Sequence, residues 1–191
     1  GEGCFKKISD ILKYSHSKRV FIISGKHILN ISDIKSQIEK YLEKYTYELF
    51  YEYTHNPKIE DIKKGIECYN NFSPDTVLSI GGGSAIDMAK SINVLSQHHG
   101  EISEIIQGVK NIREKGKPLI AVPTTSGTGS ESTKFAVVYI GSKKYSLEHD
   151  FLLPDYAIVD PCLTKSLPSE IIATSGMDAI SQSIESFWSV N

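Results

Sequence analysis

The sequence predicts an α/β fold in which a mainly parallel sheet carries helices on both faces. Short, continuously apolar runs such as residues 19–23 and 76–80 are typical of strands buried on both sides. Segments with apolar residues at helical spacing, such as residues 34–45, lie between such runs. Two runs lead directly into loops rich in glycine and hydroxyl residues, at 81–84 and 123–131. Strands that alternate with helices through short links form a doubly wound sheet.

The elements can be placed along the chain from these patterns and from the prolines. Strands are expected at residues 19–23, 47–53, 76–80, 118–123, 135–140 and 156–160. Helices are expected at residues 34–45, from Asn56-Pro57 to about Tyr69, at 85–95, and from Pro168 onward. The last helix has no sheet partner left in the sequence, so it should open a different unit.

Composition excludes several classes of protein. The formal net charge is -2 over 191 residues, which gives no electrostatic case for a nucleic-acid or anionic-membrane partner. No apolar run approaches the roughly 20 residues of a membrane span. Cys4, Cys68 and Cys162 are far apart and form no CxxC, so a disulfide framework or thiolate zinc site is not expected. Reduced thiols fit a cytoplasmic protein.

The turn Gly81-Gly82-Gly83-Ser84 lies between a buried strand and an amphipathic helix. Free amides and the dipole at a helix N-terminus favour an anion there, and glycine lets a phosphate approach closely. Ser84 could cap the helix or reach a phosphate oxygen. The turn fits neither GxGxxG, since Ile86 replaces the third glycine, nor a Walker A loop. The alternative is a tight turn that needs glycine for its backbone angles.

A second loop, residues 123–131, follows another buried strand and places five hydroxyl side chains around two glycines. Loops at the carboxyl ends of neighbouring strands in a doubly wound sheet converge on one crevice. Hydroxyl groups there can bond ribose, carboxamide or phosphate. The alternative is a solvated Ser/Thr loop.

Four motifs together resemble the iron-containing (group III) alcohol dehydrogenase family. They are GGGSAIDMAK at 81–90, PTTSGTGSE at 123–131, DP at 160–161 and GMDA at 176–179. The resemblance implies a dehydroquinate-synthase-like fold with a Rossmann-like N-terminal domain. Residues 1–167 would form the NAD(P)-binding α/β domain, and residues 168–191 the first helix of an all-α domain for metal and substrate.

The resemblance also implies roles for individual residues. Pyrophosphate would lie against Gly82, Gly83 and Ser84, and the adenosine and nicotinamide-ribose portions along Thr124, Thr125 and Thr128. Asp87 would face the cofactor or substrate, with Lys90 at helical spacing where it could pair with Asp87. Asn56 resembles an asparagine that the family places near the cleft.

Cofactor choice is expected to depend on Gly25 and Lys26. Many family members have a carboxylate after the first strand that repels a 2′-phosphate. Here Ser24-Gly25 stands at that place and Lys26 follows. The sequence therefore predicts NAD(P) binding with NADP favoured over NAD.

The resemblance implies a divalent metal, Fe or Zn, held by one Asp and three His. Asp178 fits the first ligand, but Gln182 stands at i+4 where the family has His. Gln is a poorer ligand than imidazole for these metals, and the other two His would lie outside this chain. A metal is therefore expected only in the full-length protein. His98, His99 and His149 are expected to be surface or capping residues.

The leading functional hypothesis is an oxidoreductase fragment that transfers a hydride between NAD(P)H and a small aldehyde or alcohol, inactive by itself. Residues 176–191 resemble the branch that reduces phosphonoacetaldehyde to 2-hydroxyethylphosphonate. Two alternatives remain: a relative of dehydroquinate synthase or glycerol-1-phosphate dehydrogenase, and a non-catalytic dinucleotide-binding module. No catalytic residue is assigned. The resemblance implies a homodimer through the N-terminal sheet edge.

Overall fold

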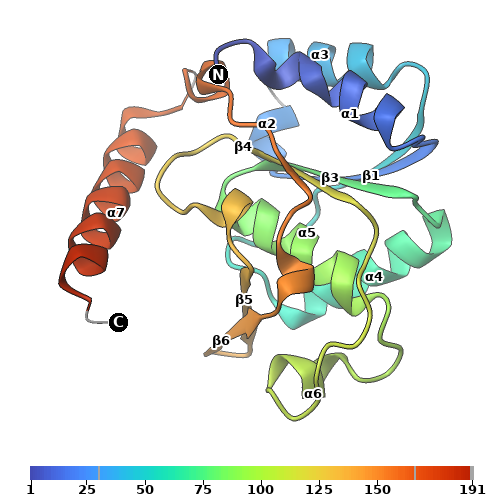
Figure 1. Cartoon of the computed structure of the whole chain (residues 1–191), viewed down its shortest axis with the longest axis vertical. Coiled ribbons are helices and arrows are strands. Elements are labelled where there is room, and N and C mark those ends of the chain that lie inside the picture. The colour runs from blue at the N-terminus through green and yellow to red at the C-terminus, as the bar shows by residue number, and fades with distance from the viewer. Residues whose placement is uncertain (30, 166, 190–191) are drawn as a thin grey trace.

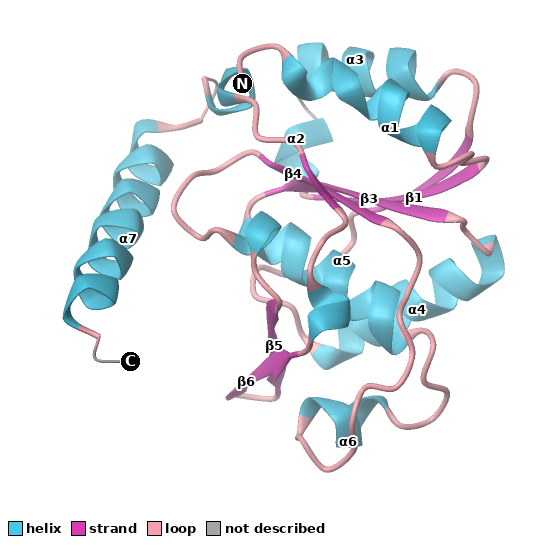
Figure 2. Cartoon of the chain, in the orientation of Figure 1, coloured by secondary structure: helices cyan, strands magenta, loops and turns pink. Residues whose placement is uncertain are grey.

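A computed structural model describes residues 1–29, 31–165 and 167–189, and it confirms the doubly wound α/β prediction. Five strands form one sheet in the order β2-β1-β3-β4-β7, and every neighbouring pair is parallel. Helices cover both faces of the sheet, and α7 stands to one side (Figures 1 and 2). No helix among the described residues is both long and apolar enough to span a bilayer.

The elements follow one another along the chain with short connections. The strands are β1 (Arg19–Ser24), β2 (Thr46–Phe50), β3 (Thr76–Gly81), β4 (Leu119–Pro123), β5 (Phe135–Ile140), β6 (Lys143–Glu148) and β7 (Tyr156–Ala157). The α-helices are α1 (Ile8–Tyr14), α2 (Lys26–Leu29), α3 (Ser32–Leu42), α4 (Ile59–Phe72), α5 (Gly83–Leu95), α6 (Ile102–Ile106) and α7 (Ser169–Trp188). Short 3₁₀ turns are η1 (Cys4–Lys7), η2 (Ser130–Ser132), η3 (Asp150–Leu152) and η4 (Pro161–Thr164).

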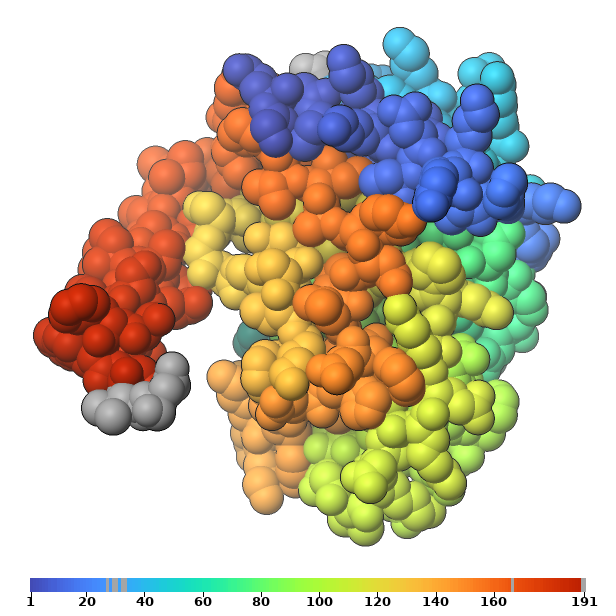
Figure 3. Space-filling view, viewed as in Figure 1, coloured from blue at the N-terminus to red at the C-terminus, as the bar shows by residue number. Residues whose placement is uncertain are grey.

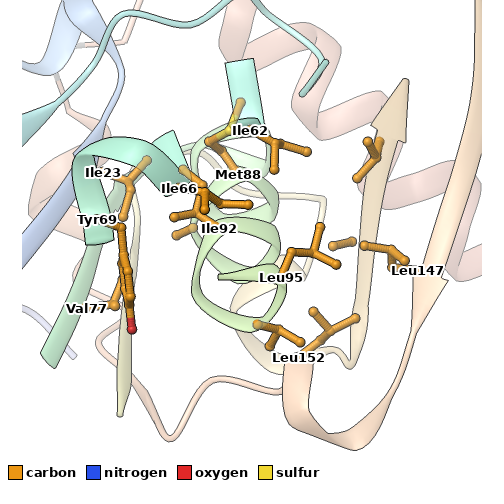
Figure 4. Close-up of a cluster of buried hydrophobic side chains, with 14 of the residues drawn as sticks. Ile23, Ile62, Ile66, Tyr69, Val77, Met88, Ile92, Leu95, Leu147 and Leu152 are labelled. Atoms are coloured by element: carbon orange, nitrogen blue, oxygen red, sulfur yellow. The ribbon is translucent and has the colours of Figure 1, made fainter. Parts of the chain in front are cut away.

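Each face of the sheet has its own hydrophobic core. Phe21 and Ile23 of β1 belong to the core that includes Met88 of α5 (Figure 4). Val20 and Ile22, which alternate with them, belong to the core on the side of α1 and α3. Side chains of a strand point alternately to opposite faces. Two buried faces therefore explain why the strand is apolar at consecutive positions.

Helix α5 is enclosed between the sheet and a second, two-stranded sheet. Every residue from Ala85 to Leu95 is buried, including Lys90 and Asn93. The hairpin of β5 and β6 lies on the side of α5 away from the main sheet (Figure 1). The helix is thus buried all round, and its polar side chains must find partners inside the protein.

Four sequence expectations need correction. Residues 135–140 were expected simply as a strand, but they pair antiparallel with β6 outside the main sheet. The sequence patterns did not predict β6, because Lys143–Glu148 is largely polar and only one of its residues is buried. The strands β2 and β7 are shorter than expected. Helix α4 begins at Ile59 instead of Pro57, since Lys58 is extended and bridges to Tyr139 of β5.

The topology has its switch point between β1 and β3. The chain runs from β1 out to β2 and then returns to place β3 on the other side of β1. In an open α/β sheet, ligands bind outside the carboxyl ends of the strands at such a point. The ends of β1 and β3 are therefore where a ligand is expected.

Asp160 joins the end of the sheet to the first residues of the chain. Its side chain is buried and accepts hydrogen bonds from the amides of Gly3 at 3.1 Å, Phe5 at 2.9 Å and Cys162 at 3.0 Å. Burial alone would raise the pKa of this carboxyl, but the three amides outweigh it and hold the pKa below its usual value. Asp160 therefore ties η1 and η4 to one point.

We expect Asp160→Asn to lower the free energy of unfolding by about 1.5–3 kcal/mol at neutral pH, as hydrogen bonds to a charged group do. Because the folded pKa lies below the unfolded value of about 3.9, this contribution is present above that pH and is lost as the pH falls. Urea unfolding of both proteins should show the difference shrinking below about pH 4. A difference that stays constant under acid would contradict this role.

Candidate functional site

Three loops meet at the carboxyl edge of the sheet, next to the switch point. Ser24 is in register with Ile80, and Gly81 is in register with Pro123. The Thr124 amide donates to the Gly81 carbonyl oxygen at 3.0 Å. A methyl group on Gly81 would lie 3.7 Å from the Gly25 nitrogen. The loops after β1, β3 and β4 are therefore in contact, as the sequence predicted.

The glycines of the turn are required for space and not for backbone angles. Gly81, Gly82 and Gly83 all avoid the positive-φ region, and Gly82 is extended with φ -76° and ψ -174°. A methyl group on Gly82 would lie 3.0 Å from the Thr125 hydroxyl oxygen, and one on Gly83 would lie 3.0 Å from Thr128 Cγ2. The alternative of a turn that needs glycine for its angles is wrong.

Helix α5 begins at this turn without a side-chain cap. Its N-cap is Gly82, whose carbonyl accepts from the amides of Ala85 at 3.0 Å and Ile86 at 3.2 Å. Ser84 lies inside the first turn and is half-buried, so the expectation that it caps the helix is wrong. An uncapped N-terminus of a 13-residue helix leaves amides and a positive dipole end for an anion.

The second loop is buried near its two ends and partly exposed between them. Thr124 is buried, Thr125 is half-buried and Thr128 is exposed. Beside the loop lies a cavity of about 400 Å³. Its lining comes from this loop and from residues 159–164, and includes Thr125, Glu131 and Asp160. Hydroxyl and carboxylate groups thus border a cavity at the edge where the glycine turn ends.

Asp87 and Lys90 both attach α5 to β5. The Asp87 carboxylate accepts from the Val137 amide at 3.1 Å, and burial raises the pKa of this carboxyl against that bond and the Lys90 charge. The Lys90 ammonium is fully buried and donates to the carbonyl oxygens of Thr133 at 2.7 Å and Phe135 at 2.8 Å. The expected pairing of Lys90 with Asp87 is therefore replaced by bonds to the strand.

Burial lowers the pKa of Lys90 to about 8, against the carboxylates of Asp87 and Glu131, which raise it. The sequence predicted no role for Glu131 and only a pairing with Asp87 for Lys90. A signal for Lys90 was present, because a lysine on a helix between two buried strands must find internal acceptors if the helix is enclosed. No comparable signal distinguished Glu131, since the cavity it borders is formed by distant segments.

The remaining predicted cofactor residues lie at the same edge. Gly25 has open space around its α-carbon, and Lys26 is exposed at the start of α2. Asn56 is exposed with φ 63°, in the connection that follows β2. Their contacts with a cofactor stay predictions.

The predicted metal ligands lie on α7, one turn apart, and both are exposed. In the described part of the chain no three His, Cys, Asp or Glu side chains are grouped as a metal site. Asp178 and Gln182 therefore supply two oxygen donors and do not by themselves fit Fe or Zn. Of the motif that suggested the phosphonoacetaldehyde branch, Val190 and Asn191 lie outside the described residues.

Of the three histidines expected to be surface or capping residues, two meet that expectation and His98 does not. His149 caps η3 by accepting from the Phe151 amide at 3.1 Å, and His99 is exposed, as expected. His98, however, is buried: one ring nitrogen contacts the Val94 carbonyl at 3.0 Å and the other accepts from the Arg113 amide at 2.9 Å. His98 thus fixes the loop after α6.

Comparisons with known proteins agree on one family. The model of the family described as iron-containing alcohol dehydrogenase matches residues 1–161. Long-chain-alcohol dehydrogenase 1 of Geobacillus thermodenitrificans is 34% identical over 195 residues, covering 100% of this chain and 49% of that protein. The sulfoacetaldehyde reductase of Bifidobacterium kashiwanohense, solved in complex with NAD⁺, is 31% identical with a TM-score of 0.93. The NADH-dependent butanol dehydrogenase A of Thermotoga maritima is 28% identical with a TM-score of 0.90.

These matches cover nearly all of this chain but only part of each relative. The two solved structures are matched over 99% and 97% of this chain, and over 50% and 47% of their own chains. The chain therefore spans about half the length of the relatives it matches.

We expect Lys90→Met to change how stability depends on pH. The folded pKa of about 8 lies below the unfolded value of about 10.4, so between these values the unfolded chain binds more protons. The wild-type protein should therefore gain stability relative to Lys90→Met as the pH rises from about 8 to 10. Urea unfolding across this range tests it, and a flat or falling difference would be the contrary result.

Proposed function

Because the chain belongs to the iron-containing alcohol dehydrogenase family, we propose that it binds NAD(P)H and forms the cofactor-binding part of an oxidoreductase. The reaction is transfer of a hydride between the nicotinamide and a small aldehyde or alcohol. NAD(P)H supplies the hydride, and the protein supplies binding and orientation.

One observation carries this proposal. Next to the switch point of the sheet, the uncapped N-terminus of α5 packs closely against the hydroxyl-rich loop, and this close approach requires glycine at positions 82 and 83. The absent side chains at Gly82 and Gly83 let Thr125 and Thr128 pack against the first turn of α5. A pyrophosphate bound at the free amides of that turn would therefore lie beside these hydroxyl groups. Thr124, Thr125 and Thr128 then line the path of the riboses.

We further propose that NADPH binds at least as well as NADH. The space around Gly25 is open and Lys26 beside it is exposed, so a 2′-phosphate meets no carboxylate from these residues. A lysine ammonium is a common phosphate partner.

A proposal for the substrate comes from one residue of α7, Gln182. Gln182 stands where the family has a histidine, which favours the branch that reduces phosphonoacetaldehyde. The similarity of this chain to a sulfoacetaldehyde reductase supports the proposal that the substrate is an aldehyde with an anionic group. We expect this chain alone not to turn over an aldehyde, because the described residues form no group of metal-ligating side chains. Where further ligands are supplied, Asp178 would be a metal ligand.

We also propose a homodimer. The strand β2 forms one edge of the main sheet, which is where a second copy would pair.

A non-catalytic dinucleotide-binding module is the second candidate function. It is favoured by the lack of any group of metal-ligating side chains among the described residues.

We expect Gly83→Ala to weaken NADPH binding by at least about tenfold, or roughly 1.4 kcal/mol. The added methyl would lie 3.0 Å from Thr128 Cγ2, so it would push the second loop away from the N-terminus of α5, where we propose that the pyrophosphate binds. Fluorescence titration measures the dissociation constant. Gly176→Ala is the matched control, because a methyl group there meets nothing within 4 Å. Equal affinity in both variants would place the dinucleotide elsewhere.

We expect Gly25→Asp to weaken NADPH relative to NADH by at least about fivefold, since unit charges 4 Å apart repel by about 1 kcal/mol in water. The new side chain fits without displacement, as a methyl at this position has open space. Titration of both cofactors gives the ratio, and Gly25→Asn controls for size. If the wild-type protein binds NADH much more tightly than NADPH, the proposed preference is wrong.

A further inference from the structure

Gly127 of the second loop lies directly against the backbone of α7. A methyl group at this position would overlap the Ser175 carbonyl oxygen and come within 3.4 Å of the Ala179 nitrogen. Gly127 also has φ +106°, which side chains rarely adopt. A glycine is therefore needed here both for the approach of a helix and for the backbone.

The pattern of exposure on α7 points independently to the same contact. Along Ser169–Trp188 only Ser175, Gly176 and Ala179 are half-buried, and every other residue is exposed. These three residues lie at or beside the backbone atoms that face Gly127. In Figure 3 the C-terminal half of α7 stands clear of the rest of the molecule. The helix is thus held to the domain over about one turn.

This turn contains one candidate ligand and adjoins the other. Asp178 immediately precedes Ala179, and Gln182 follows one turn later. We propose that Gly127 is a positioning residue: by seating α7 on the dinucleotide loop, it fixes Asp178 and Gln182 relative to the nicotinamide end of the cofactor. The packing of α7 on the second loop follows from the contact between Gly127 and Ser175 alone. The effect of this packing on the cofactor site rests on the proposed function.

The seating predicts a local effect of Gly127→Ala. The methyl pushes α7 away, so the amides of residues 176–188 should exchange hydrogen faster by about tenfold. Gly129→Ala is the control: Gly129 also has positive φ, +61°, but a methyl there meets only the Ser132 hydroxyl, at 3.9 Å. Exchange of β4 amides reports any global loss of stability in both variants.

Energy transfer from a tryptophan to NADH can distinguish a displacement of α7 from a loss of stability of the whole protein. Trp188, the only tryptophan, is on α7, and its emission can transfer energy to bound NADH. At saturating NADH, transfer should be reduced in Gly127→Ala and unchanged in Gly129→Ala, whatever the affinities.

If the amides of α7 exchange hydrogen at the same rate in Gly127→Ala and Gly129→Ala, the proposed role of Gly127 is wrong. It is also wrong if energy transfer from Trp188 to NADH falls equally in both variants. If NADH saturates neither the wild-type protein nor the variants, the proposed cofactor site fails. Hydrogen exchange in the free protein then still decides whether Gly127 seats α7.

Discussion

The enclosure of α5 determines the geometry of the candidate site. This helix is buried from Ala85 to Leu95 between the main sheet and the hairpin of β5 and β6. A close-packed interior allows little movement, so the N-terminus of α5 is fixed at the carboxyl edge. Lys90 extends this constraint through bonds to the carbonyls of Thr133, just before β5, and of Phe135 in β5, and Asp87 extends it through the Val137 amide. The loop between β4 and β5 is thereby anchored at the same helix whose first turn it faces.

Close approach of backbones is the second constraint. At Gly82 and Gly83 the missing side chains let the turn contact Thr125 and Thr128, although the backbone angles are ordinary. At Gly127 the missing side chain lets a helix rest on the same loop. The loop thus has the proposed dinucleotide site on one side and α7 on the other. The same loop therefore contacts both the proposed cofactor site and the helix that carries the candidate ligands Asp178 and Gln182.

The family match and the structure support the cofactor proposal more directly than the metal and substrate proposals. The match over residues 1–161 concerns the α/β domain, and the chain spans about half the length of its relatives. The apolar side chains of α7, among them Ile180, Ile184 and Phe187, are exposed among the described residues. The proposed cofactor site uses only elements within this chain, whereas the metal and substrate proposals depend on residues that the described elements do not supply.

The sequence by itself determined the layered architecture and the edge that carries the site. Apolar runs such as residues 19–23 must be buried on both faces, and parallel strands bring the loops after them to one edge. Local pattern could not reveal the β5–β6 hairpin, because Lys143–Glu148 is polar and is held by its partner strand. Nor could it show that Lys90 bonds to β5, that His98 is buried, or that Gly127 meets Ser175. Those facts depend on contacts between residues far apart in the chain, and only the packing of complete elements decides which distant atoms meet.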